Sequence, residues 1–406
     1  MEVASEIFVV IIAIVIVYYS TNDIRERGIV FIALFVRLGM VFYDVHVSDL
    51  PGTGTDTYFF DRAASNSMIT AWSDVFVHFD LGARLYVWFV GLIYSVLGSD
   101  RFVPQAINAL FASLAVVNVV RVFKVFNRKA TLAALLVAFW PSSVLYTSLL
   151  LRDSVVMYLL SAGVLQMVLW KESKAPKNLV IGAWIFLAGS AFHTGMIVAI
   201  PAMMFFVLLT GLGPGDRKKK GKAKSTIGLL LISGILVIGF SSGVGLQKLE
   251  RLESLDANSL TERQSEAARS RAAYLADLPI SGPIDLVLQA PVRTIYFLFS
   301  PFPWQVSGSA DLLGAFDAVS ILCVVFLIVK NIWKRKTFVR ARPFILFTCI
   351  SISAYVFGTS NYGTAIRHRM KFVPVLLVVL AASQRSPNSA ANEIEPRLQR
   401  HQSRSR

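Results

Sequence analysis

Long apolar stretches separated by short charged segments recur along the whole chain. A helix needs about 20 mostly apolar residues to cross the hydrocarbon core of a bilayer. By this criterion the pattern predicts about eleven spans, namely residues 5–20, 28–45, 102–123, 130–149, 154–170, two within 178–211, 226–245, 311–330, 342–360 and 370–384. Because such stretches repeat, we expect an all-α fold, a polytopic integral membrane helical bundle.

Clusters of Lys and Arg indicate on which side of the membrane each span begins or ends. The clusters are residues 25–27, 121–129, 171–177, 217–224, 330–342 and 385–406. Basic loops are retained in the cytoplasm during insertion, so successive clusters must be joined by an even number of crossings. This parity predicts a multi-pass protein of the plasma (inner) membrane with an extracytoplasmic N-terminus. The last cluster, residues 385–406, is predicted to be a disordered cytoplasmic tail.

Two segments need separate treatment under this parity rule. Three apolar runs lie between Arg27 and Arg121, and the middle one, Leu85–Leu97, is the shortest and is rich in aromatic residues. We therefore expect Leu85–Leu97 to be an interfacial helix at the extracytoplasmic membrane surface. The run Leu179–Thr210 has basic clusters at both ends. At about 1.5 Å per residue it is too long for one upright span, which predicts a helical hairpin with His193 near its turn.

Residues 1–384 are thus predicted to form a single transmembrane domain with large extracytoplasmic loops at 46–101 and 246–310. Composition excludes a water-soluble protein, because 55% of the residues are apolar, 16% are charged and the mean hydropathy is +0.60. The net charge of +15 suggests nucleic acid, but the basic residues fall at the ends of apolar runs, so no nucleic-acid partner is expected. Cys323 and Cys349 lie in apolar runs and predict neither a disulfide nor a metal site.

Acidic residues gather at the predicted extracytoplasmic surface. Asp49 and Asp56 lie in the first loop, and Asp153 follows Arg152 between two apolar runs. A carboxylate that is partly removed from water can act as a general base or hold a divalent cation. Charges that border hydrocarbon are costly and are usually functional or paired. The alternatives are that Asp49 and Asp56 cap a helix or stand in a solvated loop, and that Arg152 and Asp153 form an ordinary short loop.

Arg367, His368 and Arg369 lie in the last predicted outer loop, where the positive-inside rule disfavours cations. A guanidinium binds phosphate oxygens in a bidentate geometry, so a phosphate or pyrophosphate group at headgroup level explains them; the alternative is contact with anionic lipid headgroups. Arg37 lies inside an apolar run and is expected to face the protein interior. The candidate phosphate ligands are Arg367, Arg369, His368, Arg152 and Arg293. His193 is a further candidate, although a lone histidine in an apolar hairpin is more often a satisfied structural residue.

Four passages of the chain carry a resemblance to a known class. They are Gly54-Thr-Asp56-Thr-Tyr58, Phe139-Trp-Pro141-Ser-Ser with the following Leu151-Arg152-Asp153, Phe192-His193-Thr-Gly, and Gly363-Thr-Ala-Ile-Arg367-His368-Arg369. These passages resemble the polytopic membrane glycosyltransferases of the GT-C class and the related bacterial exopolysaccharide or O-antigen polymerases. The resemblance implies a GT-C-like fold and a sugar substrate linked to polyprenyl phosphate or pyrophosphate at the extracytoplasmic face. It also implies that Asp56 or Asp49 is the catalytic base, that Asp153 supports it and that Arg367 and Arg369 bind the phosphate, with Tyr58 a further candidate.

The chain differs from the transferases of that class in three respects. It has no adjacent acidic pair in the first loop and no large C-terminal soluble domain, and it carries an extra N-terminal span. These differences favour a polysaccharide polymerase whose donor and acceptor are both lipid-linked glycans. No cofactor is expected, and a divalent cation at the carboxylates stays open. The expected partners are the bilayer, the polyprenyl-linked glycan and other polysaccharide assembly proteins.

Two other functions remain as alternatives. A transporter or flippase for lipid-linked sugars also gathers arginines near phosphate, but transporters usually show repeated halves, and the sequence shows no clear internal repeat. A non-catalytic member of a polysaccharide assembly complex is the third possibility.

Overall fold

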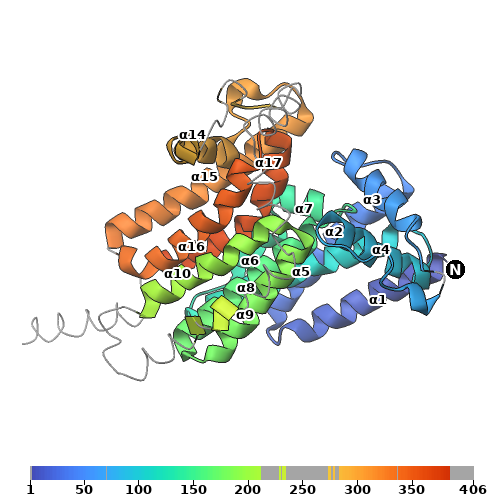
Figure 1. Ribbon diagram of the computed structural model, residues 1–406, viewed down its shortest axis with the longest axis horizontal. Coiled ribbons are helices and arrows are strands. Elements are labelled where there is room, and N and C mark those ends of the chain that lie inside the picture. Colours follow the sequence, from blue (N-terminus) through green and yellow to red (C-terminus); the bar gives the residue numbers. More distant parts are fainter. Residues whose placement is uncertain are drawn as a thin grey trace, which may run out of the picture.

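The computed structural model describes residues 2–69, 71–211, 228–229, 231–234, 273–275, 278, 283–335 and 337–384. The elements within these ranges are helical, with one isolated antiparallel bridge between Ala273 and Asn361 (Figure 1). The expected tail 385–406 lies outside the described residues. So do most of the expected span 226–245 and most of residues 246–282 in the expected second loop.

Six helices in the described part of the chain are long and apolar enough to cross a membrane. They are α1 (Glu2–Ser20), α2 (Ile24–His46), α5 (Phe102–Val125), α8 (Asp153–Ser173), α15 (Ser309–Arg335) and α16 (Phe338–Phe357). Their length and composition indicate a membrane-embedded helical protein. The predicted total of about eleven spans is not confirmed, because the other described apolar helices are shorter than a full crossing needs.

The remaining described helices connect or flank these six. They are α3 (Thr55–Ser65), η1 (Trp72–Asp74), α4 (Ala83–Leu97), α6 (Thr131–Ala138), α7 (Pro141–Thr147), α9 (Pro176–Phe192), η2 (Thr194–Val198), α10 (Ala199–Gly211), α14 (Pro283–Phe299), η3 (Pro303–Gln305), α17 (Tyr362–Arg369), η4 (Met370–Phe372) and α18 (Val373–Ser383). The expected hairpin is present as α9, η2 and α10. His193 lies at its turn, as predicted, where extended backbone ends α9 and leads into η2.

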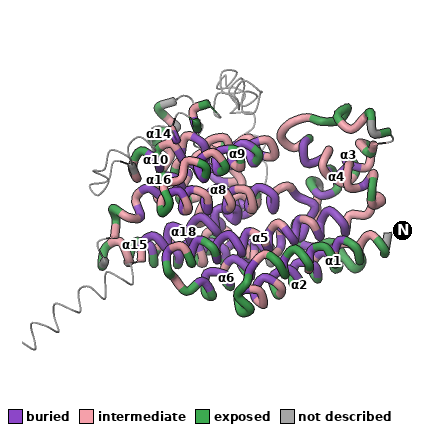
Figure 2. The backbone as a smooth tube through the Cα atoms, turned by 90° about the horizontal axis from the view of Figure 1, so that it is seen from below, coloured by how far each residue is buried: buried purple, intermediate pink, exposed green. Residues whose placement is uncertain are grey.

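The main hydrophobic core lies among α5, α8, α9, α16 and α18. Every residue of α18 is buried, and Figure 2 shows α5, α8 and α18 as mainly buried tubes. The helix α1 differs, because Ile7, Phe8 and Ile11 and other apolar side chains on it are exposed. An apolar helix surface of this kind is the surface that lipid covers.

A second, smaller hydrophobic cluster holds α3 and α4 against one end of the bundle. It contains Phe60, Ala64, Tyr86, Val90, Leu149, Leu150, Leu151 and Val155, among others. The two helices pack closely at Gly91, where an added Cβ would lie 3.0 Å from the carbonyl oxygen of Ser67. This packing fixes α3 near the start of α8 and thereby positions Asp56. The helix expected at Leu85–Leu97 is present as α4, and its place at the membrane surface stays a prediction.

The expected span 130–149 is not one helix. The helix α6 ends before Phe139, and α7 begins with Pro141. The proline ring disfavours a helical conformation at Trp140, whose backbone is extended with φ −63° and ψ 117°. The segment is therefore two short helices joined by a break, which the count of apolar residues alone did not reveal.

Arg37 of α2 supplies hydrogen-bond donors at this break. Its side chain is fully buried, and its Nη1 donates to the carbonyl oxygens of Ala138 at 2.8 Å and Ala33 at 3.1 Å. Its Nε donates to the hydroxyl of Thr147 at 3.0 Å. Irregular backbone at membrane depth needs such partners, because hydrocarbon offers none. Arg37 thus faces the interior, as expected, and joins α2 to both halves of the broken helix.

Replacing Arg37 by methionine removes the donors while it keeps a long apolar side chain. A buried acceptor left without a partner costs about 1–3 kcal/mol, so we expect Arg37→Met to lower the thermal midpoint of the detergent-purified protein. Arg121→Met is the matched control, because Arg121 is exposed and donates to a single backbone carbonyl. A midpoint equal to that of the native protein in Arg37→Met would contradict this role.

Candidate functional site

Charged residues from three distant parts of the chain meet at Arg367. Arg367 of α17 lies between Asp153, the first residue of α8, and Asp56 of α3. Its Nε donates to Oδ2 of Asp153 at 2.7 Å, and its Nη1 donates to Oδ2 of Asp56 at 2.5 Å. Lys371 forms a second ion pair with Asp153, and its Nζ lies 2.9 Å from Nδ1 of His368. These five residues are called the Arg367 cluster below.

Helix geometry explains how the cations of the cluster come to one face. The side chain of Asn361 accepts a hydrogen bond from the Gly363 N–H and so caps the start of α17. The helical path continues through η4, and Arg367 and Lys371, four residues apart, lie on the same side. Asp153 stands at the N-terminus of α8, where the helix dipole favours a negative charge. A helix terminus and two cations therefore stabilise this one carboxylate.

Burial divides the cluster into a fixed part and an accessible part. The side chains of Asp153 and Lys371 are at most 1% exposed, whereas that of Arg367 is 19% exposed and that of Asp56 is 57% exposed. A buried charge is tolerated only when it is paired. The Asp153–Lys371 pair is therefore the anchor, and Asp56 is the carboxylate that is accessible from solvent.

The cluster and its surroundings carry more positive than negative charge. Arg152 directly precedes Asp153, and its Nη1 donates to a backbone carbonyl of α9 at 2.8 Å, while its buried Nε has no hydrogen-bond partner. Burial lowers the pKa of Arg152, and the neighbouring Asp153 opposes this shift. For Arg367 burial also acts against the charge, but its two carboxylates outweigh it and raise the pKa. Three cations, counting Lys371, thus face two carboxylates, which suits an anionic ligand.

A layer of rings lies behind the cations. The ring of His193 stacks on Tyr355 with 4.8 Å between centroids, and it meets His368 edge to face at 5.3 Å. Lys371 is charged in its pair with Asp153, and an ammonium group can only donate hydrogen bonds. Nδ1 of His368 therefore accepts the hydrogen bond from Lys371, which requires a neutral imidazole. Burial and then the charge of Lys371 hold the pKa of His368 well below its usual value. The hydroxyl of Tyr355 is buried and has no hydrogen-bond partner. The structure therefore places His193 against His368 at the edge of the cluster.

Asp49 and Tyr58 pair with each other instead of joining the cluster. The hydroxyl of Tyr58 donates to Oδ2 of Asp49 at 2.5 Å, and Arg101 lies 4.0 Å from the other oxygen. This hydrogen bond to the carboxylate raises the pKa of Tyr58. Asp49 is 48% exposed and pairs with Tyr58 and Arg101, so of the two candidate bases Asp56 is the one that touches Arg367.

Arg369 and Arg293 are engaged inside the protein. Arg369 is fully buried; its Nε donates to Asp317 at 2.5 Å, and its other nitrogens donate to backbone carbonyls that include those of Ser300 at 2.5 Å and Gly314 at 2.8 Å. Arg293 is also buried; it donates to an amide side chain and to a backbone carbonyl, while its Nη1 has no hydrogen-bond partner. The structure does not bring either guanidinium to Arg367, and the contacts of both are those of structural residues.

Two residues of this region are not among the site residues that the sequence predicts. The sequence places Lys371 at the start of a span, although its position four residues after Arg367 puts both cations on one helical face. Asp317 lies within an apolar stretch, and its carboxylate accepts hydrogen bonds from Trp140 and Ser142 in addition to pairing with Arg369. A carboxylate inside an apolar run is a signal that would have found it.

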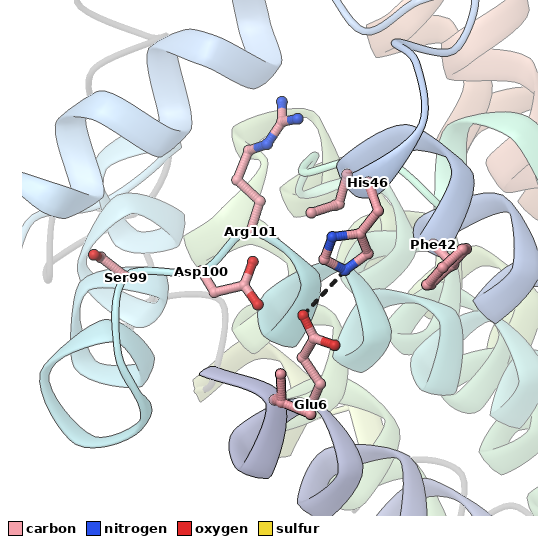
Figure 3. A pocket seen from close by; sticks show the side chains of 8 residues that line it. Glu6, Phe42, His46, Ser99, Asp100 and Arg101 are labelled. Carbon is pink, nitrogen blue, oxygen red and sulfur yellow. Dashed lines mark ion pairs between the residues drawn. The ribbon is translucent and has the colours of Figure 1, made fainter. Parts of the chain in front are cut away.

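Two cavities open near this end of the bundle. The first, of about 660 Å³, is shown in Figure 3; there Glu6 pairs with His46 at 3.0 Å, Asp100 lies beside them, and the Arg101 guanidinium points away. The second, of about 720 Å³, follows α3 and is lined by Gly54, Tyr58, Phe59, Arg62, Ala63 and Asn66. Neither is lined by Arg367, and the second is the one that lies along the helix of Asp56.

The carboxylates of the cluster are paired with cations. Within the described ranges, no three or more His, Cys, Asp or Glu side chains are grouped so that they could hold a metal ion.

The two carboxylates should differ sharply in their effect on stability. Asp153→Asn leaves the buried Lys371 without its counterion and Arg367 with Asp56 alone, which costs about 3–5 kcal/mol, so we expect a much lower thermal midpoint or loss of folded protein. Asp56→Asn removes an exposed pair worth about 0–1 kcal/mol and should shift the midpoint by only about 2 °C. Thermal unfolding in detergent measures both, and equal shifts would contradict the division between anchor and accessible carboxylate.

His368 should make stability fall in mild acid. In the unfolded chain its pKa is about 6.5, whereas in the folded protein it is much lower, so below about pH 6.5 the unfolded state binds a proton that the folded state does not. Stability contributed by neutral His368 is therefore complete above this pH and is lost as pH falls. We expect the thermal midpoint to drop more between pH 7.5 and 5.5 in the native protein than in His368→Asn. Parallel pH profiles would refute this.

Together with the neighbouring Arg152, the cluster thus offers an exposed carboxylate, a guanidinium held by a buried anchor and an excess of positive charge. No protein-family model matches the chain, and no curated protein matches it.

Proposed function

We propose that this chain is a membrane glycosyltransferase of surface or exopolysaccharide biosynthesis. In this proposal it is a polysaccharide polymerase that uses glycans linked to polyprenyl phosphate or pyrophosphate at the extracytoplasmic face. The observation that supports the proposal is the position of Arg367 between the exposed Asp56 and the buried Asp153. Arg367 is thereby held by the buried Asp153, while its contact with the exposed Asp56 is the one that a ligand can replace.

Arg367 is the proposed phosphate ligand. Its Nε remains on Asp153, whereas the partner of its Nη1 is the exposed Asp56. An exposed ion pair is worth only about 0–1 kcal/mol, so a phosphate group, which carries more charge and more acceptor oxygens, can replace Asp56 on this nitrogen. Arg152, whose buried Nε has no hydrogen-bond partner, provides a second cation beside it.

Asp56 is the proposed general base. When a phosphate takes its place on Arg367, the carboxylate is released next to the bound donor. The acceptor hydroxyl oxygen then attacks the anomeric carbon, and its proton passes to Asp56. The bond between the anomeric carbon and the phosphate oxygen breaks, and its electron pair leaves on the lipid phosphate. Replacement of Asp56 by the phosphate on Arg367 thus both binds the substrate and frees the base.

Cations near the phosphate favour the transition state over the ground state. The leaving phosphate oxygen gains negative charge as the glycosidic bond breaks, so Arg367 and Arg152 interact with it more strongly at that point. The buried anchor contributes because Asp153 and Lys371 hold Arg367 in place before the reaction. Such preorganised charge needs little rearrangement during the chemical step.

The groove along α3 supports a glycan as the substrate. Tyr58 and Phe59 are 44% and 58% exposed, and Arg62 and Asn66 add hydrogen-bonding groups to the same cavity. Apolar ring faces with a few polar groups suit a sugar ring, which has C–H faces and hydroxyl edges. Phe59 lies three residues after Asp56, so the groove and the proposed base share one side of the helix.

The broken helix favours a second candidate, a transporter for lipid-linked sugars. Transporters often contain discontinuous helices and buried charges near the middle of the membrane, and α6, α7 and Arg37 have these features. In this chain, however, Arg37 is occupied by carbonyl and hydroxyl groups, whereas the Arg367 cluster has an accessible carboxylate. A non-catalytic role in a polysaccharide assembly complex is the third candidate and has no observation of its own.

Asp56→Ala and Arg367→Ala should each abolish polymer formation while membrane insertion stays intact, because one removes the base and the other the phosphate ligand. The readout is polymer produced by cells that carry each variant, normalised to protein level. The controls are Asp80→Ala and Arg84→Ala, since these two residues form an exposed ion pair on the same outer segment without touching the cluster. Normal polymer in both cluster variants would overturn the proposal.

An assay in detergent separates transfer from transport. Purified protein is mixed with a lipid-linked oligosaccharide, and the products are analysed for longer glycans and released lipid phosphate. Detergent micelles have no two sides, so transport produces neither product. If the glycan is extended and the extension requires Asp56 and Arg367, the result supports the transferase. If the substrate stays unchanged although the same protein gives polymer in cells, the result supports the transporter.

A further inference from the structure

A third cavity lies at the end of the bundle opposite the Arg367 cluster. It has a volume of about 400 Å³ and is enclosed by the turn after α5, by α6 and by the end of α18. The residues that line it are Phe123, Asn127, Arg128, Lys129, Leu132, Ala133, Leu136, Leu377, Leu380 and Gln384. Nothing in the proposed function uses this cavity.

The lining of this cavity is divided into a polar and an apolar part. Asn127, Arg128 and Lys129 come from the turn, and Gln384 follows the end of α18, so the polar groups gather at the end of the bundle. The apolar residues come from within the helices. Leu132 and Leu136 are one turn apart on α6, about 6 Å along its axis. The cavity thus changes from polar to apolar over the depth of one helical turn.

The turn itself holds the basic residues in place. Asn127 has a φ of +52°, in the left-handed region that asparagine tolerates better than most residues. The N–H of Arg128 returns to the carbonyl of Phe123 at 2.8 Å, which closes the turn. Arg128 and Lys129 therefore stand together at the polar end of the cavity.

From this division we propose that the cavity binds an anionic glycerophospholipid, with its phosphate at Arg128 and Lys129 and an acyl chain along α6 and α18. A basic pocket at the end of membrane helices attracts negatively charged headgroups. The wall on α6 is open to the bilayer, because Leu132 is 69% exposed, while Leu377 on the opposite wall is fully buried. A lipid can therefore enter from the side and lie between a surface helix and a core helix.

The ligand chemistry follows from both halves of the cavity. The two cations distinguish a net negative headgroup from a zwitterionic one, since the latter carries its own positive charge. The leucines distinguish a lipid from free phosphate, because only the lipid buries an apolar chain against them. We therefore expect anionic phospholipid to bind, and phosphatidylcholine and inorganic phosphate to bind much more weakly.

The test uses the full-length protein in detergent with defined lipids. Retention of phosphatidylglycerol in native mass spectrometry and the thermal midpoint are measured against phosphatidylcholine with the same chains and against inorganic phosphate. Two surface charges that each contribute about 1 kcal/mol correspond to about a 30-fold loss of affinity in the double variant Arg128→Gln/Lys129→Gln. The double variant Arg25→Gln/Lys177→Gln is the control, because both residues are exposed near the same basic end but lie outside the cavity.

Selective retention of phosphatidylglycerol that is lost in the cavity variant and kept in the control supports the site. Equal losses in both double variants mean a general surface charge effect and overturn it. Equal stabilisation by inorganic phosphate overturns the lipid assignment, and equal binding of phosphatidylcholine overturns the role of the cations. The comparison of ligands on the native protein decides the question even if the variant is poorly produced.

Discussion

A charge in the interior of a membrane bundle has no water around it and must find partners within the protein. Arg37 donates to the carbonyls at a helix break, Arg369 pairs with Asp317, and Lys371 pairs with Asp153. Apolar helix surfaces do not select one neighbour over another in lipid, because lipid tails are as apolar as leucine. These polar contacts therefore specify which helices meet, and they tie α2 to α6, α15 to α17, and α8 to η4.

The same constraint acts differently on the two ends of Arg367. Towards the core it meets Asp153, which has a second cation and a helix N-terminus to stabilise it. Towards the surface it meets Asp56, which has water around it. An arginine with two equally buried partners would be fixed, and one with two exposed partners would be poorly positioned. The unequal burial gives a guanidinium that keeps its orientation while one of its contacts can change.

The sequence allowed the hairpin at His193 and the inward direction of Arg37 to be predicted, because both follow from apolar spacing. It did not separate Arg367 from Arg369, which were treated as equal members of a loop. The structure continues a helix through both, and residues two apart on a helix point about 200° from each other. One guanidinium therefore faces the accessible carboxylate and the other is buried. The break at Pro141 was missed for a related reason, since length and hydropathy record how much chain is apolar and not where its hydrogen bonds are interrupted.

The broken helix between α6 and α7 also sets an order on assembly. Arg37 and Thr147 are 110 residues apart, so this contact can form once the first third of the chain has been inserted. The indole of Trp140 can donate to Asp317 only after a further 177 residues have been synthesised. Asp317 pairs with Arg369, which lies later still in the chain. The contacts of the break with Arg37 therefore need only the first part of the chain, whereas its contacts with Asp317 need α15. The interrupted helix thus makes its polar contacts with two distant parts of the chain, α2 before it and α15 after it.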